Sequence, residues 1–421
     1  MKLFIIMSIV LFGVGLYGQV TLEDCVDAGL KNSGLIRQAE MDRKSAAMSL
    51  RSSRLDFLPA ITASTQNNYG KSGNWLLAKT FSVSQNLDLF DERYYSLKAA
   101  QIEEEISALD LREKQRELVL EIVQIYTELL ILKKERMVHN RSLEIYEAEE
   151  SFLQQMLESG VKNELDLYSV QIEMQNALLQ IKRTERDIAT NLNELERIIG
   201  FQPDIDALQD YFINIPDSIS IKPEYNYDVQ LATHQVELSE NALKRSFANL
   251  LPRLSLEGIC QWSDIDYLND SNDNYETVGN QIDSGMRNSD WTVALTLSYP
   301  LGDYFSRRSK HAMAKYQSRK REIHYDETMK ETNNKMSEFM LDISLKQDEL
   351  EIHQQKNELA VKKYELAKAR YRSGIIDFLE FNNAENEKAK SEIELHKTNY
   401  ELMMTYLRYQ VYSGEEVLGI Y

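Results

Sequence analysis

The hydrophobic pattern along the chain is dominated by two very long helical segments. From Arg93 to Ser159 the sequence contains no proline and no glycine. At a rise of 1.5 Å per residue, an unbroken helix of this length would extend about 100 Å. Apolar residues recur at steps of four and three inside it, and at steps of seven in the second half of the chain. The two stripes are Leu118, Ile122, Ile125, Leu129 and Leu132, and Leu345, Ile352, Leu359 and Leu366. This spacing predicts helices packed side by side with left-handed supercoiling.

Four shorter segments alternate between apolar and polar residues, which predicts β-strands. The expected strands are Ile61–Tyr69, Lys79–Leu89, Arg253–Trp262 and Trp291–Tyr299, each of about ten residues. The connections within each pair, Gly70–Leu77 and Ser263–Ser289, are polar and are expected to be loops.

The same order of elements occurs twice. Gly160 and Gly200 are matched by Gly374 and Gly414, both at an offset of 214 residues. Upstream, Leu58-Pro59 is matched by Leu251-Pro252 at an offset of 193, and Asp91 is matched by Asp303 at an offset of 212. The second copy therefore carries 19 extra residues (212 − 193) between its proline and its aspartate. Each copy is expected to run helix, two strands, long helix, turn, helix. The sequence therefore predicts an internal duplication, with a first repeat at 19–200, a linker at 201–224 and a second repeat at 225–421.

The beginning of the chain predicts export. Lys2 is followed by a short apolar run and then by Gly18, a pattern typical of a secretory signal peptide. We expect residues 1–18 to be the signal peptide, with cleavage before Gln19. An uncleaved signal anchor is the alternative.

Composition narrows the function class. A net charge of −19 argues against a nucleic-acid partner. A hydrophobic content of 43% is too high for a disordered chain, and a mean hydropathy of −0.45 excludes a multi-span helical membrane protein. The two cysteines, Cys25 and Cys260, are predicted to be free thiols, because a helix start and a strand are expected to lie far apart.

Candidate chemistry is sparse. The six histidines, at 139, 234, 311, 324, 353 and 396, are scattered and form no HExxH motif. Gly70-Lys71-Ser72 lacks the earlier glycine of a phosphate-binding loop. The Asp270, Asn272 and Asn274 series lacks the glycine and the glutamate of a calcium loop, which favours a solvated loop over a calcium site. The sequence predicts no enzyme, no cofactor and no metal site.

The strands pose a physical problem that one chain cannot solve. Strands of about ten residues are long enough to cross a bilayer when tilted. Their aromatic ends are typical of outer-membrane strands, and they are Tyr69, Trp75, Trp262, Trp291 and Tyr299. A sheet can span lipid only when it is closed, because an open edge leaves backbone groups unsatisfied. Four strands are too few to close, whereas three copies would pool twelve.

At this point the chain resembles the TolC family of outer-membrane efflux and secretion channels. The resemblance rests on the duplicated plan, on the Leu-Pro before each strand pair, and on the turn glycines Gly160 and Gly374. The stretch from Tyr371 to Glu380 is similar to the motif at the family's periplasmic tip. The resemblance implies a mainly α fold with a small β part. Long helical hairpins form an α-barrel, and four transmembrane strands per chain pool into a twelve-strand β-barrel in a homotrimer.

The same resemblance implies a location, partners and a gate. The channel would sit in the outer membrane of a Gram-negative bacterium, with a large periplasmic part. It would act as a passive exit duct that docks to a periplasmic adaptor and to a proton-driven or ATP-driven inner-membrane transporter. The residues that match the gate region are Asp166, Glu380, Tyr371, Arg372, Asp377 and Asn383, with Gly160 and Gly374 in the tip turns.

The match at the gate has two gaps. The family's arginine two residues after the second glycine is Ile376 here, and its second acidic ring residue is Asn383. Arg372 and Asp377 are candidates to replace the missing contacts that would hold the tip closed. A simpler interpretation makes Asp166 and Glu380 ordinary acids at helix starts, where the helix dipole favours them.

Two other classes of protein stay open. A periplasmic adaptor would carry one helical hairpin between glycine-rich β halves, whereas this sequence predicts two hairpins. A structural exported coiled coil would have no use for amphipathic strands with aromatic ends.

Overall fold

The computed structural model of the chain describes residues 19–69, 74–88, 92–158, 164–216, 221–269, 288–299 and 301–415. The expected signal peptide, the turn glycine Gly160, the Gly70-Lys71-Ser72 stretch and the Asp270–Asn274 series lie outside the described residues.

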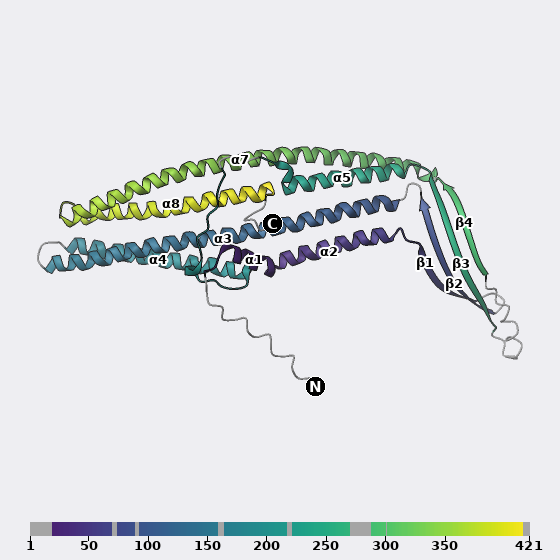
Figure 1. Cartoon of the computed structure of the whole chain (residues 1–421), viewed down its shortest axis with the longest axis horizontal. Coiled ribbons are helices and arrows are strands. Elements are labelled where there is room, and N and C mark those ends of the chain that lie inside the picture. Colours follow the sequence, from purple (N-terminus) through teal and green to yellow (C-terminus); the bar gives the residue numbers. More distant parts are fainter. Residues whose placement is uncertain are drawn as a thin grey trace, which may run out of the picture. The chain divides into compact units, whose positions relative to one another are not determined.

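The described part of the chain is mainly helical, with one four-stranded sheet (Figure 1). The first half contains α1 (Leu22–Asn32), α2 (Gly34–Leu55), β1 (Ala60–Tyr69), β2 (Asn74–Asp88), α3 (Glu92–Glu158) and α4 (Glu164–Ile199). The short helices η1 (Ile205–Ala207) and η2 (Pro223–Tyr225) follow. The second half contains α5 (Tyr227–Ala248), β3 (Arg253–Asn269), β4 (Asn288–Ser298), η4 (Leu301–Asp303), α7 (Tyr304–Arg372) and α8 (Phe378–Ser413). Within these residues, no helix has the length and apolarity that a membrane span requires.

The sheet is antiparallel, and its strands lie in chain order, β1-β2-β3-β4 (Figure 1). Its register gives the sheet two different faces, because directly paired residues share a face. On one face, Phe81 pairs with Trp262, Val83 with Cys260 and Leu87 with Leu256. The opposite face carries polar residues; Thr62 pairs with Ser82, which pairs in turn with Gln261. The alternation seen in the sequence thus becomes one apolar and one polar surface.

The two central strands are longer than the sequence predicts. β2 has 15 residues and β3 has 17, and they pair without interruption from Asn74–Asn269 to Asp88–Ser255. Residues 74–77 and 263–269, expected to be loop, therefore belong to strands. The alternation continues through Asp264, Ile265, Asp266 and Tyr267, but its acidic residues resemble those of a solvated loop.

The first predicted helix is divided in two at Ser33. This residue has extended backbone angles (φ −62°, ψ 125°) and caps the end of α1. Asn32 and Ser33 are weak helix formers that favour caps, and Gly34 follows them. The Asn32 side chain donates a hydrogen bond to the carbonyl of Ile199, while Arg37 donates to the Asn32 carbonyl at 2.9 Å. These contacts hold the break against the end of α4.

Contacts divide the chain into two compact units that differ from the two sequence repeats. One unit takes Met1–Ala39, Asp110–Gln230 and Met329–Tyr421, and the other takes Glu40–Leu109 and Leu231–Thr328. Each unit combines segments of both repeats, because the long helices α3 and α7 run through both. The first unit has an apolar core built by α1, α3, α4 and α8, in which Cys25, Ile122, Leu129 and Leu407 are fully buried.

The matched positions of the two repeats have matching geometry. Gly200 and Gly414 end helices of 36 residues each, and both have left-handed backbone, with φ of 85° and 78°. In the second unit, Arg93 donates to the carbonyl of Asp56 at 2.9 Å, and Arg307 donates to the carbonyl of Asn249 at 3.0 Å. These residues are related by the offsets 214 and 193 read from the sequence.

Both cysteines carry free thiols. Cys25 is buried in the core of the first unit, and burial raises the pKa of its thiol to about 12. Cys260 lies in β3.

Candidate functional site

The turn between α7 and α8 is closed by backbone hydrogen bonds around Gly374. The Ile375 amide donates to the Arg370 carbonyl and the Gly374 amide to the Tyr371 carbonyl, both at 2.9 Å. This pair of bonds is the Schellman motif, which needs a left-handed residue, and Gly374 supplies it with φ of 70°. Asp377 then caps α8 by accepting a hydrogen bond from the Glu380 amide at 2.9 Å.

An aromatic cluster lies directly behind this turn, and we call it the tip cluster. It takes side chains from all four long helices of the first unit: Tyr146 and Leu153 of α3, Val170 and Ala177 of α4, Tyr364 and Tyr371 of α7, and Phe378 and Phe381 of α8. Tyr371 is 2% exposed, and its ring stacks on Phe381 with 5.0 Å between ring centres. The cluster therefore joins the two helical hairpins of one chain close to their turns.

A buried carboxylate pairs with Arg372 at the edge of the tip cluster. The Glu149 side chain is buried, and its Oε1 lies 3.1 Å from the Arg372 guanidinium. Arg372 also covers the ring of Phe152 at 5.7 Å. Burial, together with the charges of Glu149 and Asp166, raises the pKa of Tyr371. The Tyr371 hydroxyl therefore stays protonated beside the carboxylates of Glu149 and Asp166.

A second buried carboxylate lies further along α8. Glu385 is 2% exposed, accepts a hydrogen bond from Ser142 at 3.1 Å and lies 3.7 Å from the Lys388 ammonium. Burial raises the pKa of Glu385 despite these contacts. One turn closer to the tip, the Tyr146 hydroxyl donates to the Asn382 side chain at 2.7 Å. Polar contacts between α3 and α8 thus alternate with the aromatic rings.

The structure brings only some of the predicted gate residues together. Tyr371 and Arg372 belong to the tip cluster or its edge, and half-buried Asp166 of α4 lies close enough to act on Tyr371. Glu380 and Asn383 are exposed on α8, and no hydrogen bond or ion pair of their side chains occurs within the described residues. Arg372 and Asp377 do not pair with each other, since one binds Glu149 and the other caps α8.

Sequence reasoning missed Glu149 and Glu385 because acids are common along all the long helices. A specific signal was present in both cases. Glu149 follows Tyr146 by three residues and precedes Leu153 by four, so it stands inside a buried stripe. Glu385 stands likewise four residues after Phe381. An acid at a stripe position, rather than beside it, distinguishes a buried carboxylate from a solvated one.

Comparison with known proteins gives the family. The family described as outer membrane efflux protein matches residues 26–201 and 223–408, most of both repeats. No curated protein matches the sequence.

Solved structures with the same fold cover almost the whole chain. A membrane protein from Pseudomonas aeruginosa is 19% identical with a TM-score of 0.76, over 96% of this chain and 91% of that one. CusC is 16% identical with a TM-score of 0.76, over 97% and 96%. The outer membrane protein VceC from Vibrio cholerae is 14% identical with a TM-score of 0.76, over 94% and 96%. The chain therefore belongs to the outer membrane efflux protein family, and it is an outer-membrane efflux channel protein of a Gram-negative bacterium, not an enzyme.

Proposed function

We propose that three copies of this chain assemble into one passive exit duct, which conducts substrate from an inner-membrane transporter across the periplasm and the outer membrane. One observation carries this proposal: a single chain leaves apolar side chains exposed at regular helical spacing. Leu345, Ile352, Leu359 and Leu366 of α7 are each more than half exposed. A soluble monomer would not be expected to present such a stripe.

The internal duplication indicates what covers that stripe. At the offset of 214, Leu345 and Ile352 correspond to Ile131 and Val138 of α3, which are buried. In one chain α3 packs against α8, as the Arg141–Glu392 ion pair and the Ser142–Glu385 hydrogen bond show. If the repeats are copies, the α7 stripe packs against the counterpart of α8, which is α4, in another chain.

The surface of α4 fits this role. Its exposed apolar residues also recur at helical spacing, and they are Leu165, Tyr168, Ile172 and Leu179. A contact between α7 of one chain and α4 of the next joins two different surfaces. Repetition of such a contact generates a ring when the rotation closes.

The second unit repeats the argument independently. There α5 packs against α3, with the Asn241 amide donating to the Tyr95 carbonyl at 2.8 Å. At the offset of 193, the positions of α5 that face α3 correspond to residues of α2 that are all exposed: Met41, Met48 and Leu55. Their expected partner is α7 of a neighbouring chain, where Met313 and Tyr316 line a shallow hollow.

The sheet supports the same assembly. β1 and β4 are the outer strands, and among the described residues neither has a partner on its outer side. The apolar side chains of β4 are strongly exposed; Trp291, Val293, Leu295 and Leu297 are 61–78% exposed. In lipid these side chains are favourable, but an open strand edge is not. Pairing β4 of one chain with β1 of the next removes every edge, and three chains give twelve strands.

The test is the mass of the purified protein in detergent, with variants of the stripes. Wild type is expected to contain three chains. Leu359→Asp and Ile172→Asp, on the two sides of the proposed interface, should each remove about 2 kcal/mol of apolar burial per interface and shift the protein toward monomer. Gln354→Asp, exposed on α7 away from the stripe, should leave the trimer intact.

Two results would contradict the proposal. One is a folded wild-type monomer that is stable in lipid. The other is a trimer that both stripe variants leave unchanged, which would exclude the α7–α4 contact.

A further inference from the structure

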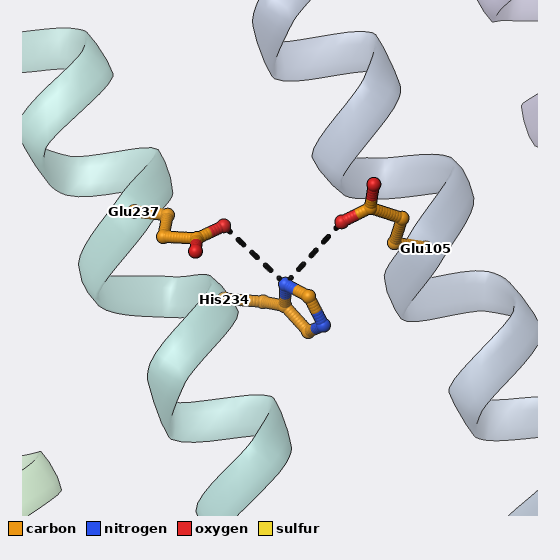
Figure 2. Close-up of side chains that lie close together, drawn as sticks. All are labelled: Glu105, His234 and Glu237. Carbon is orange, nitrogen blue, oxygen red and sulfur yellow. Dashed lines mark ion pairs between the residues drawn. The ribbon is translucent and has the colours of Figure 1, made fainter.

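Three side chains converge between α3 and α5, within the second unit. Glu105 comes from α3, and His234 and Glu237 come from α5; Figure 2 shows the imidazole lying between the two carboxylates. One nitrogen of His234 and one oxygen of each glutamate all lie within 4.8 Å of one another. The sequence predicts no metal site here, because Glu105 and His234 lie on helices far apart in the chain.

The backbone positions these groups independently of any contact among them. His234 and Glu237 are three residues apart on one helix, so they share a face. Further along the same helix pair, the Asn241 amide binds the Tyr95 carbonyl and Arg245 binds Glu92. These contacts fix the register of α5 on α3 and thereby the separation of the three side chains.

Hydrogen bonding does not account for the convergence. His234 Nδ1 lies 3.7 Å from a Glu105 oxygen and 3.5 Å from a Glu237 oxygen, at or beyond the limit of a hydrogen bond. This nitrogen is shielded from solvent and has no hydrogen-bond partner among the residues that the structure describes. An imidazole nitrogen carries at most one hydrogen, so it cannot serve two carboxylates equally.

The spacing is instead close to that of ligands around a small divalent cation. Zinc bonds to histidine and carboxylate measure about 2.0–2.2 Å, which in a tetrahedron places neighbouring ligand atoms about 3.3–3.5 Å apart. The 3.5 Å distance to Glu237 lies at the upper end of this range, the 3.7 Å distance to Glu105 lies slightly above it, and the two glutamate oxygens lie within 4.8 Å of each other. Small side-chain rotations would close the difference, since the glutamates are 57% and 50% exposed and free to move.

Charge agrees with this geometry. Two carboxylates and a neutral imidazole carry two negative charges, which balance one divalent cation. Within the described part of the chain, no lysine or arginine pairs with Glu105 or Glu237, although many other glutamates have such a partner. A nitrogen ligand favours the zinc class over calcium or magnesium, which prefer oxygen.

The ligand set occurs in only one of the two related positions. At the offsets 214 and 193, Glu105, His234 and Glu237 correspond to Arg319, Met41 and Lys44. The cluster is therefore not a by-product of helix packing that both repeats share. We propose that Glu105, His234 and Glu237 form a binding site for one zinc-class divalent cation per chain, which bridges α3 and α5 and is completed by water.

The experiment uses the full chain, purified in detergent and stripped with a chelator. Titration with Zn²⁺ should show one saturable site per chain, and Co²⁺ should give a visible absorption band from the same site. Glu237→Gln, which keeps the side-chain shape, and His234→Ala should each weaken Zn²⁺ binding at least tenfold. Mg²⁺ at the same concentration should not compete.

A matched control removes another histidine. His324→Ala, exposed on α7, should bind Zn²⁺ as wild type does. Circular dichroism on every variant verifies that the helices are intact. The inference is overturned if His234→Ala binds Zn²⁺ as tightly as wild type, if His324→Ala loses as much, or if wild type shows only unsaturable binding.

Discussion

Two glutamates take positions in the buried stripes that apolar residues otherwise occupy. Glu149 and Glu385 are each 2% exposed; among the described residues Glu149 pairs with Arg372, and Glu385 contacts Ser142 and Lys388. Burial of a carboxylate is costly even when it is paired, so these residues lower the stability of the helix contacts around them relative to an apolar side chain. Arg372, which pairs with Glu149, has a half-exposed side chain, so this ion pair lies at the boundary between core and solvent.

The free-energy cost of burying the Glu385 carboxylate depends on pH. Burial raises its pKa above the ordinary value of 4.5. The folded chain therefore binds this proton more tightly than the unfolded chain, and unfolding becomes easier as the pH rises from about 4.5 through the folded pKa. Glu385→Gln removes this pH-dependent loss of stability, because glutamine does not ionise. At pH 7 its thermal unfolding midpoint should lie above that of wild type, and the difference should vanish in acid.

Glu387→Gln is the control for that prediction, since Glu387 is an exposed partner of Lys363 and its ion pair contributes little. A lower midpoint for Glu385→Gln at pH 7 would mean that the contacts with Ser142 and Lys388 outweigh the burial of charge.

At the scale of the elements, the α7–α8 turn is specified by its backbone geometry. Its Schellman motif depends on left-handed backbone at Gly374, while the space around the missing side chain is empty. Asp377 then begins α8 within three residues. A short connection of this kind forces the two helices to lie antiparallel and fixes which of their faces meet in the tip cluster.

Gly374→Ala tests the backbone requirement alone, because an added methyl group meets no atom within 4 Å. The variant should lose ~1 kcal/mol in the free energy of unfolding, the cost of a left-handed residue that is not glycine. Gly34→Ala is the matched control, since that glycine has ordinary helical backbone and equal space. It should be neutral or slightly stabilising. Equal effects of the two substitutions would show that backbone strain at the turn is unimportant.

On the scale of the whole molecule, we propose that the acids of the tip act together only in the assembled trimer. One chain leaves Glu380 exposed and without a partner for its carboxylate among the described residues. A trimer would bring three copies of Glu380, and three of Asp166, toward one axis. Like charges gathered in a constriction attract cations, and this is how rings of acids select ions in channels.

Single-channel recording in a bilayer tests whether Glu380 forms a ring of acids that selects cations. Glu380→Ala should weaken the preference for cations and the block by multivalent cations. Glu358→Ala, an exposed acid on α7 far from the turn, is expected to conduct like wild type. Unchanged selectivity in Glu380→Ala would remove Glu380 from the gate but would leave the channel function intact.

The tip illustrates where prediction from the sequence stops. Arg372 was a candidate because it stands beside a turn glycine, but its partner Glu149 lies on another hairpin, and no local pattern specifies that pairing. The ends of β2 and β3 were missed for a similar reason. Pairing of two central strands over 15 residue pairs extends them through residues that in isolation favour loops.

The sequence by itself determined the architecture of this protein. Its long helices follow from runs without proline or glycine and its strands from alternation of apolar and polar residues, while glycines at a constant offset support the proposed duplication. These features are local or periodic, so the sequence indicates them without any knowledge of long-range contacts. Only the tertiary structure decided which acids are buried, how the strands pair and that Glu105 meets His234. Such contacts depend on the register between distant helices, which is fixed by many small packing interactions that a single sequence does not rank.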